Sequence, residues 1–298
     1  MVLPAEWSIE LYSHPSPFLQ RMEDAVSLWR EETEAHIQIV ESWREGVPLL
    51  PSVLRYWADH PERHELVRGV VVDFSIPAKN GIDVLKALGE WRGSRILLTC
   101  YEDLSIAVTA FNEGLIDQFI PKHGSPELVP RGLRQLRWSG NPVVNALWES
   151  MLKPWQKQVL SEPGIIEEIA LLSESRWVEH FVLFEPFGVI GLTMNGECEW
   201  LQLECDFSRQ ALAEIGSEVG LASSAISAIE NGKMIAAIEL HDQLRTKGAV
   251  QMEAANSFGN STNLRWALFQ VDTTSLGVHI KPYRDVLRAT EHRTVVES

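Results

Sequence analysis

The sequence is short of basic residues, has few cysteines and contains no long apolar run. Of its 298 residues, 26 are Lys or Arg and 41 are Asp or Glu, which gives a formal net charge of −15. Phosphate contacts need Lys and Arg, so this balance argues against a protein whose main partner is nucleic acid. A single basic face on an acidic body is still compatible with these numbers, so DNA binding stays open.

The remaining absences concern membranes and export. No apolar run approaches the roughly 20 residues that span a bilayer, and the start MVLPAEWSIE lacks the basic and apolar regions of a signal peptide. The three cysteines, Cys100, Cys198 and Cys205, are an odd number without metal-like spacing, as in a reducing compartment. We therefore expect a cytoplasmic protein with no membrane partner.

What is present indicates a folded chain with two domains. Hydrophobic residues make up 45% and charged residues 22% of the sequence. The length suits two domains, and the turn-forming residues Ser139–Pro142 indicate a boundary. We expect domains at residues 1–139 and 140–298.

The first domain alternates between strand-like and helix-like segments. Gly69–Phe74 is a continuous apolar run that contains one acid near its end, as in a central parallel strand buried on both faces. Five β–α units in order predict an α/β fold with a doubly wound parallel five-stranded sheet. The five strands are expected at residues 8–12, 36–40, 69–74, 95–99 and 117–121, and the last helix at residues 125–138.

The segment GVVVDFSIPAKNG, residues 69–81, carries the most specific pattern. An apolar strand ends in Asp73, and the loop behind it contains Pro77, Asn80 and Gly81. This segment resembles the third strand and following loop of the CheY-like receiver family of response regulators, whose fold is flavodoxin-like. The resemblance implies that Asp73 is the phosphoacceptor of a two-component phosphorelay, with a histidine kinase or phosphotransfer protein as partner.

Two further strand ends match the same family. RILLT ends in Thr99, at the switch position, and QFIPK ends in Lys122, three residues after the aromatic Phe119. Lys122 would neutralise phosphoryl oxygens and the Thr99 hydroxyl would donate a hydrogen bond to them. The resemblance implies that this hydrogen bond lets Phe119 change rotamer, so that phosphorylation selects between two states.

The metal site that the family implies is incomplete. Receivers hold Mg²⁺ with the acceptor Asp73 and an acidic pair at the end of the first strand, but here that place reads Tyr12-Ser13-His14-Pro15. Mg²⁺ prefers hard oxygen ligands, so Ser13 and His14 are poor substitutes.

Other acids offer little compensation for the missing pair. Glu10 is not expected to reach the site, which leaves Glu102 and Asp103 as donors in another geometry. We therefore expect weak or absent phosphorylation of Asp73. The alternative is a phosphorylation-independent pseudo-receiver that acts as a docking or dimerisation module.

The second domain has the pattern of an α+β domain with an antiparallel sheet. Two strand-like segments flank Asn195-Gly196, a dipeptide typical of tight hairpins. Helices are expected at residues 208–219 and 223–230. The acids Glu197, Glu199, Glu204 and Asp206 include alternating hairpin positions, so some of them are expected to face water together on a solvated sheet face.

Residues 213–233 allow two interpretations. They resemble the helix-turn-helix of phage-repressor-like proteins, with Gly220 and Leu221 in the turn. A recognition helix usually presents Arg, Lys, Gln or Asn, whereas residues 223–230 offer serines and a glutamate. The alternative is a helix pair used for packing, with Ala225, Ile226 and Ile229 in the core.

The order of elements in this half is also similar to the output region of quorum-sensing response regulators of the α-hydroxyketone type. That resemblance implies a regulator of density-dependent gene expression without an enzymatic output.

A basic stripe of three arginines, spaced by three residues, is expected on the last helix of the first domain. The stripe consists of Arg131, Arg134 and Arg137. Its three alternative interpretations are a domain interface, a homodimer contact and a solvated face.

Overall fold

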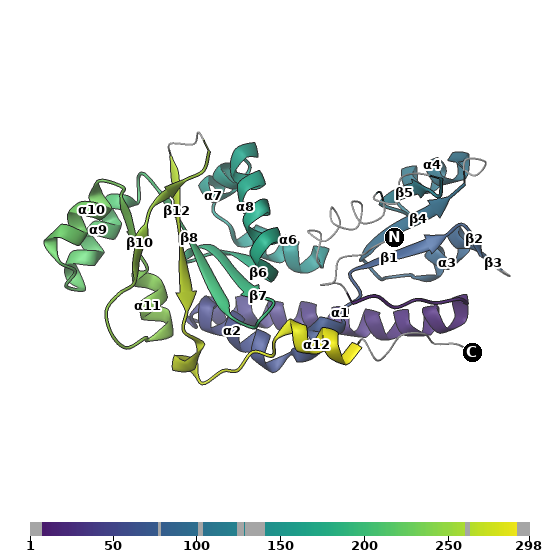
Figure 1. The fold of residues 1–298 in the computed structure, drawn as a ribbon, viewed down its shortest axis with the longest axis horizontal. Coiled ribbons are helices and arrows are strands. Elements are labelled where there is room, and N and C mark those ends of the chain that lie inside the picture. Colours follow the sequence, from purple (N-terminus) through teal and green to yellow (C-terminus); the bar gives the residue numbers. More distant parts are fainter. Residues whose placement is uncertain are drawn as a thin grey trace. The chain divides into compact units, whose positions relative to one another are not determined.

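The computed structural model describes residues 8–76, 79–100, 104–123, 128, 141–259 and 263–290. The chain forms two compact units (Figure 1). Unit 1 comprises Met1–Ile37, Glu62–Ala146 and Asp285–Ser298, and unit 2 comprises Gln38–Pro61 and Leu147–Arg284. Unit 2 therefore includes a segment, Gln38–Pro61, that the sequence pattern places in the first domain.

Unit 1 is built on a parallel sheet of three strands. The strand order is β1-β4-β5, so β4 is central and β1 lies at an edge. Within the described residues β1 is therefore an edge strand and not the central strand expected, and Val71 in its middle is 37% exposed. The elements are β1 (Gly69–Asp73), β2 (Ser75–Ile76), β3 (Lys79–Asn80), α3 (Gly81–Ala87), β4 (Ser94–Thr99), α4 (Leu104–Asn112) and β5 (Gln118–Pro121).

The first two expected strands do not form. Residues 8–12 have no regular structure, and residues 36–40 lie inside helix α1 (Pro15–Arg44). The segment HIQIV resembles a strand when read alone, but its buried residues continue a helical spacing that starts with Met22 and Ala25. Of the five expected parallel strands, the described residues contain three, and the broader prediction of a mixed α/β fold is confirmed.

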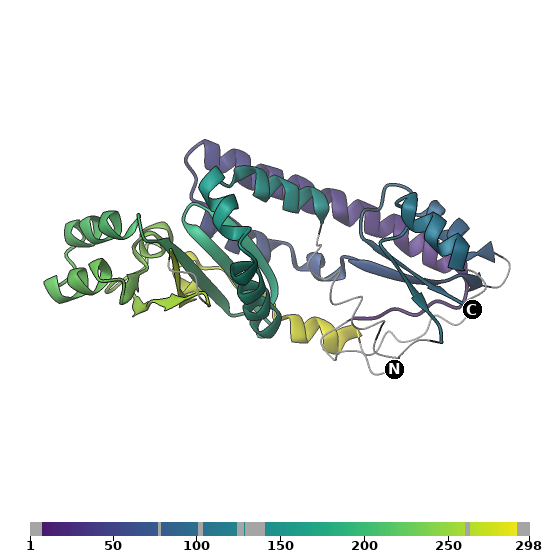
Figure 2. The same ribbon diagram turned by 90° about the horizontal axis from the view of Figure 1, so that it is seen from above.

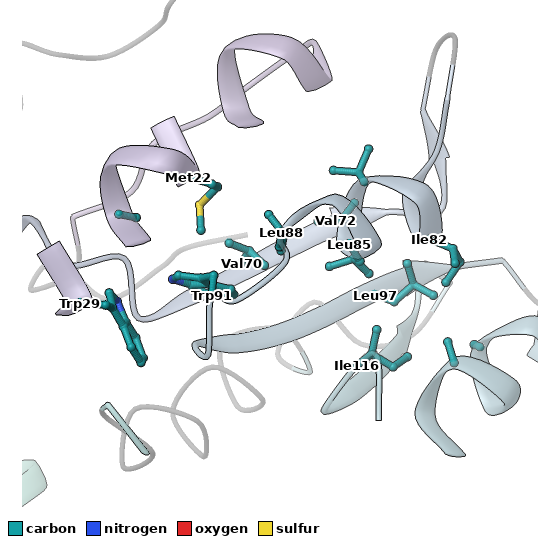
Figure 3. Close-up of a cluster of buried hydrophobic side chains, with 14 of the residues drawn as sticks. Met22, Trp29, Val70, Val72, Ile82, Leu85, Leu88, Trp91, Leu97 and Ile116 are labelled. Carbon is teal, nitrogen blue, oxygen red and sulfur yellow. The ribbon is translucent and has the colours of Figure 1, made fainter. Parts of the chain in front are cut away.

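The core of unit 1 lies between its sheet and the helices that cover it (Figure 3). The indole of Trp29 in α1 meets the ring of Trp91 edge-on, with ring centroids 6.1 Å apart, and its Nε1 donates to the carbonyl oxygen of Val67 at 3.1 Å. Leu97 of the central strand is fully buried in the same cluster. These contacts fix β1 and β4, whose ends carry the candidate site.

Unit 2 contains an antiparallel sheet of five strands in the order β11-β12-β8-β7-β6, which confirms the predicted antiparallel α+β pattern. The predicted hairpin joins β7 to β8, and Gly196 takes a φ of +83° in its turn. The strands are β6 (Trp177–Phe184), β7 (Phe187–Thr193), β8 (Cys198–Cys205), β11 (Asn256–Ser257) and β12 (Leu264–Val271).

Two glycines in β7 make room for tryptophan side chains. A Cβ atom on Gly191 would lie 2.1 Å from the ring of Trp177, and one on Gly188 would lie 2.5 Å from the ring of Trp200. Glycine inside a strand often marks such a close approach.

Helices cover both faces of this sheet. Ile165 and Ile169 of α8 belong to a core cluster with Leu201, whereas Phe181 of β6 stacks on Trp57 of α2 with centroids 5.8 Å apart. Helices α9 and α10 lie side by side in both views (Figures 1 and 2). The helices of this unit include α2 (Leu49–Asp59), α7 (Pro154–Leu160), α8 (Pro163–Arg176), α9 (Arg209–Glu218), α10 (Ser223–Glu230) and α11 (Ile238–Leu244).

The remaining elements are η1 (Pro61–Glu65), α6 (Pro142–Met151), β9 (Met234–Ala236), β10 (Met252–Ala254), η3 (Thr273–Leu276) and α12 (Tyr283–Thr290). Within the described part of the chain, no helix combines the length and apolar character needed to cross a membrane.

Candidate functional site

The ends of the three parallel strands of unit 1 bring the predicted site residues to one edge of the sheet. β1 ends at Asp73, β4 ends at Thr99, and Lys122 follows the last residue of β5. The backbone N–H of Lys122 donates to the carbonyl oxygen of Thr99 at 2.8 Å. Carboxyl ends of parallel strands meet at a common edge, which is where sites form in such sheets.

Asp73 and Lys122 form a direct ion pair at this edge. The distance from Nζ of Lys122 to Oδ1 of Asp73 is 2.6 Å, and the two side chains are 29% and 36% exposed, respectively. The backbone N–H of Ser75 also donates to Oδ1, at 2.9 Å. Both contacts use the same oxygen, and Oδ2 has no hydrogen-bond partner within the described residues.

The loop behind Asp73 is held close to it by a glycine and a helix cap. The N–H of Gly81 donates to the carbonyl oxygen of Phe74 at 2.9 Å, and a Cβ atom on Gly81 would lie only 2.2 Å from the carbonyl oxygen of Asp73. Asn80 caps α3 by accepting a hydrogen bond from the N–H of Ile82. Pro77, the remaining predicted loop residue, lies outside the described residues.

Thr99 and Phe119 occupy inward positions. Thr99 is 1% exposed, and its hydroxyl donates to the carbonyl oxygen of Cys100 at 3.1 Å. Phe119 is half-buried and packs against the core cluster of unit 1. The Thr99 hydroxyl must therefore exchange its present acceptor before it can donate to a group on Asp73.

The described residues do not fit a Mg²⁺ site around Asp73. Ser13 and His14 hydrogen-bond to each other at 2.9 Å, and Glu10 pairs with Arg21 at 3.2 Å. The part of the chain that the structure describes contains no group of three His, Cys, Asp or Glu residues placed to hold a metal.

Several candidates from the sequence lie outside the described residues. These are Glu102 and Asp103, the alternative metal donors in the sequence, and the basic stripe of Arg131, Arg134 and Arg137.

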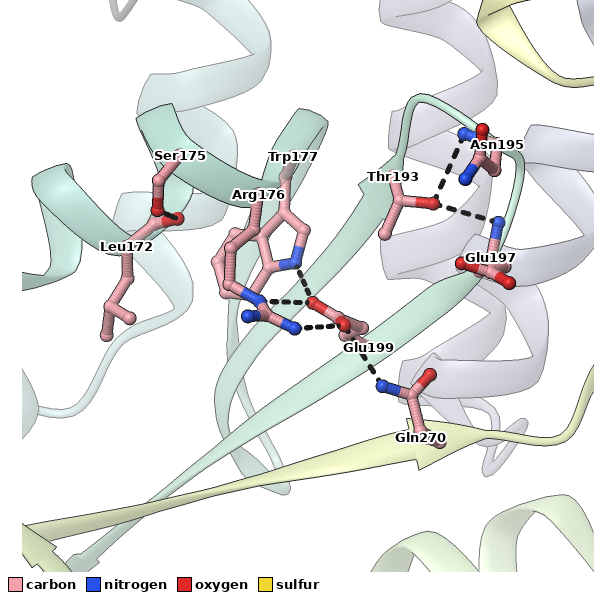
Figure 4. Close-up of polar contacts among 9 residues, drawn as sticks. All are labelled: Leu172, Ser175, Arg176, Trp177, Thr193, Asn195, Glu197, Glu199 and Gln270. Atoms are coloured by element: carbon pink, nitrogen blue, oxygen red, sulfur yellow. Dashed lines mark hydrogen bonds and ion pairs between the residues drawn. The ribbon is translucent and has the colours of Figure 1, made fainter.

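Glu199 corrects the expectation of a solvated acidic face on the hairpin. It is 4% exposed and accepts hydrogen bonds from three side chains (Figure 4). Arg176 binds it with Nε at 2.8 Å and Nη2 at 2.5 Å, Trp177 donates at 2.8 Å and Gln270 at 3.0 Å. The sequence gives little signal for this group, because its members come from four separate elements, α8, β6, β8 and β12.

The pKa values of two acids of β8 shift in opposite directions. Burial raises the pKa of the Glu199 carboxyl, but hydrogen bonds from Arg176, Trp177 and Gln270 and the charge of Arg176 outweigh burial, so the pKa falls below its usual value. Burial raises the pKa of Glu204 above its usual value, although Ser208 and Gln202 donate hydrogen bonds that oppose the shift.

Comparison with solved structures finds a similar fold. The structure of the Legionella pneumophila response regulator LqsR matches with a TM-score of 0.57 and 20% sequence identity, over 78% of this chain and 79% of that chain. Adenylate cyclase from Rhodopirellula baltica matches 28% of this chain and 60% of that chain with 20% identity, but its TM-score of 0.24 is too low to indicate a common fold. No protein-family model matches the chain, and no curated protein matches its sequence. The fold is therefore similar to that of a response regulator.

Proposed function

We propose that the chain is a signal-transduction regulator in which Asp73 accepts a phosphoryl group and unit 2 is the output region. The ion pair between Asp73 and Lys122 at the edge of the parallel sheet carries this proposal. The structural likeness to the LqsR response regulator supports the same class of function.

The chemistry needs a nucleophile and a cation close together. Lys122 and the N–H of Ser75 hold Oδ1, which leaves Oδ2 to attack the phosphorus of a phosphohistidine on a partner kinase. A P–O bond to Asp73 forms as the P–N bond breaks, and the released imidazole takes up a proton. Lys122 balances charge on the transferring oxygens.

The Thr99 hydroxyl links this reaction to a conformational change. It would leave the carbonyl oxygen of Cys100 and donate to the phosphoryl group, and the movement would free space for Phe119. In a switch of this kind, one charge-assisted hydrogen bond shifts the equilibrium between two conformations. By the resemblance of its element order, the regulated process is density-dependent gene expression.

Intact-mass spectrometry after incubation with acetyl phosphate tests the proposal. We expect a mass increase of one phosphoryl group in the wild type and none in Asp73→Asn. Because the described residues do not fit a Mg²⁺ site, chelation of divalent cations with EDTA should leave the extent of modification unchanged. An unmodified wild type, with and without Mg²⁺, would contradict the proposal.

A second candidate function is a pseudo-receiver that docks or dimerises without phosphorylation. The lack of a described metal-binding group near Asp73 favours it. It predicts that Asp73→Asn and wild type give the same molar mass in light scattering and the same regulatory output.

Direct DNA binding by α9 and α10 is a third candidate. Gly220 takes a φ of +82° between the two helices, and Ile229 is fully buried. These features suit a helix-turn-helix but equally suit helix packing. A gel-shift titration against salt distinguishes them, because phosphate contacts make binding strongly salt-dependent.

A further inference from the structure

Two arginine side chains of unit 2 meet at a glycine. Arg209 begins α9 and Arg265 lies in β12, while Gly232 lies in the turn between α10 and β9 with a φ of +63°. A Cβ atom on Gly232 would lie 2.4 Å from Nη1 of Arg209 and 3.2 Å from Nε of Arg265. Both guanidinium groups therefore lie against the same backbone carbon and close to each other.

The charge of Arg265 is poorly balanced. Its Nη1 donates to the hydroxyl of Ser257 at 3.0 Å. Its Nε is shielded from solvent, and among the described residues this nitrogen has no acceptor and the side chain forms no ion pair. The guanidinium therefore has no counter-charge among the described residues. Because Nε is shielded, an anionic ligand would bind Arg265 through its outer nitrogens.

The neighbouring acids do not supply that partner. Asp206 pairs with Arg209 at 3.2 Å. Glu204 lies directly opposite Arg265 in the sheet register, but its carboxyl accepts from the side chains of Ser208 at 2.6 Å and Gln202 at 2.8 Å. Burial also raises the pKa of Glu204, which weakens it as a counter-charge.

We propose that Arg209, Arg265 and Ser257 bind a small molecule through a phosphate group. Guanidinium groups match the geometry of phosphate oxygens and bind them with charge-assisted hydrogen bonds. The hydroxyl of Ser257 provides a neutral donor beside them, and the absence of a side chain on Gly232 leaves room for the approach of both arginines. This site lies in unit 2 and does not depend on phosphorylation of Asp73.

The surrounding charge favours a small ligand over nucleic acid. Helices α9 and α10 carry Glu214, Glu218 and Glu230, all exposed, and Arg209 is the one Lys or Arg in either helix. A long polyanion would be repelled by these carboxylates, whereas a single phosphate contacts the two arginines alone.

Isothermal titration calorimetry on the full chain tests the site. The probes are inorganic phosphate, phosphoserine and adenosine monophosphate, each at constant ionic strength with chloride as the reference anion. We expect a dissociation constant in the millimolar range or below for at least one probe, and weakening of at least about tenfold in Arg265→Met, which is the loss of about one charge-assisted contact. Arg55→Met, which removes an exposed arginine of α2, should bind as the wild type does.

The relative affinities of the three probes distinguish free phosphate from a phosphate ester as the ligand. Similar affinities for all three probes identify the free anion as the ligand, and an ester that binds at least tenfold more tightly identifies an organic phosphate. Ser257→Ala, with circular dichroism as a check of folding, replaces Arg265→Met if that variant does not fold. The proposal is overturned if no probe binds, if Arg265→Met and Arg55→Met behave alike, or if duplex DNA binds through Arg265 and the small phosphates do not compete.

Discussion

Asp73 and Lys122 form a close ion pair at the edge of the sheet in unit 1. One cation at 2.6 Å holds Oδ1, and no second acid of the described residues is placed to bring in a metal. If Asp73 accepts a phosphoryl group as proposed, Lys122 is a described cation placed to balance its charge.

Removal of this ammonium group should slow phosphorylation of Asp73. In Lys122→Met we expect the rate with acetyl phosphate to fall by about 10²-fold, the usual effect of losing one preorganised charge partner. A time course by intact-mass spectrometry measures it. Lys79→Met, which removes an exposed lysine of the nearby β3, is the matched control and should react at the wild-type rate. Equal rates in all three proteins would show that the ion pair is structural.

In unit 2, the buried carboxylate of Glu199 forms an ion pair with Arg176, and this pair has a structural role. The side chain of Glu199 is 5% exposed, and that of Arg176 is 40% exposed. Loss of the arginine leaves a buried charge without its partner, so Arg176→Met should lower the free energy of unfolding by about 3 kcal/mol. Urea denaturation followed by tryptophan fluorescence measures it, with Arg55→Met as the control. A change below about 0.5 kcal/mol, typical of surface substitutions, would contradict this reading.

The same carboxylate should make stability depend on pH. The pKa of Glu199 is lower in the folded state than its usual value, so the group stabilises the fold above an unfolded-state pKa of about 4.3. That contribution is lost as the pH falls through the lower, folded-state pKa. We expect the midpoint of urea unfolding to fall more steeply in wild type than in Glu199→Gln when the pH is lowered below about 4.3. Parallel curves would show that Glu199 does not titrate with folding.

At the scale of elements, the turn from β1 into α3 depends on one glycine. A methyl group on Gly81 would overlap the backbone carbonyl of Asp73, since the closest distance is 2.2 Å. Gly81→Ala should therefore cost about 1–3 kcal/mol of stability, as overpacking does, and should also slow phosphorylation because the end of β1 shifts.

Gly164→Ala is the matched control for this substitution. Gly164 lies in the first turn of α8, and a Cβ atom there would have no neighbour within 4 Å. Alanine at a compatible position is neutral or slightly stabilising. Thermal unfolding by differential scanning calorimetry compares the two variants, and equal melting temperatures would show that β1 and α3 adjust freely.

At the scale of the whole molecule, the two units do not follow the order of the chain. Unit 2 uses α2, in which Leu54 and Trp57 are fully buried, and the N–H of Leu50 donates to the side chain of Gln243 in α11 at 3.1 Å. The domain boundary expected from the sequence, between residues 139 and 140, would place these partners in different domains.

The isolated fragment 140–298 should therefore fail to fold stably. Without α2, the ring of Phe181 loses its stacking on Trp57, and a large apolar surface becomes exposed. Dispersed amide signals in a heteronuclear NMR spectrum of the fragment would contradict this prediction. Trp57→Ala in the full chain is the companion variant, and should cost about 3–5 kcal/mol as other large core truncations do.

The sequence predicts some elements of unit 1 correctly and others incorrectly. The strands that end at Thr99 and Pro121 lie where the apolar runs place them. These elements are specified locally. The segment HIQIV is not, because its buried face follows the helical period of the preceding 20 or so residues, and a five-residue window does not contain that information.

The sequence by itself determined the strand ends with Asp73, Thr99 and Lys122, the hairpin at Gly196 and the two helices around Gly220. Each of these features depends on residues close together in the chain, through side-chain periodicity or turn chemistry. Only the tertiary structure decided that β1 is an edge strand, that Glu199 is buried in a group with Arg176 and Gln270, and that α2 belongs to unit 2. Those properties arise from contacts between residues far apart in sequence, and burial and pairing energies are set by the partner and not by the residue type alone.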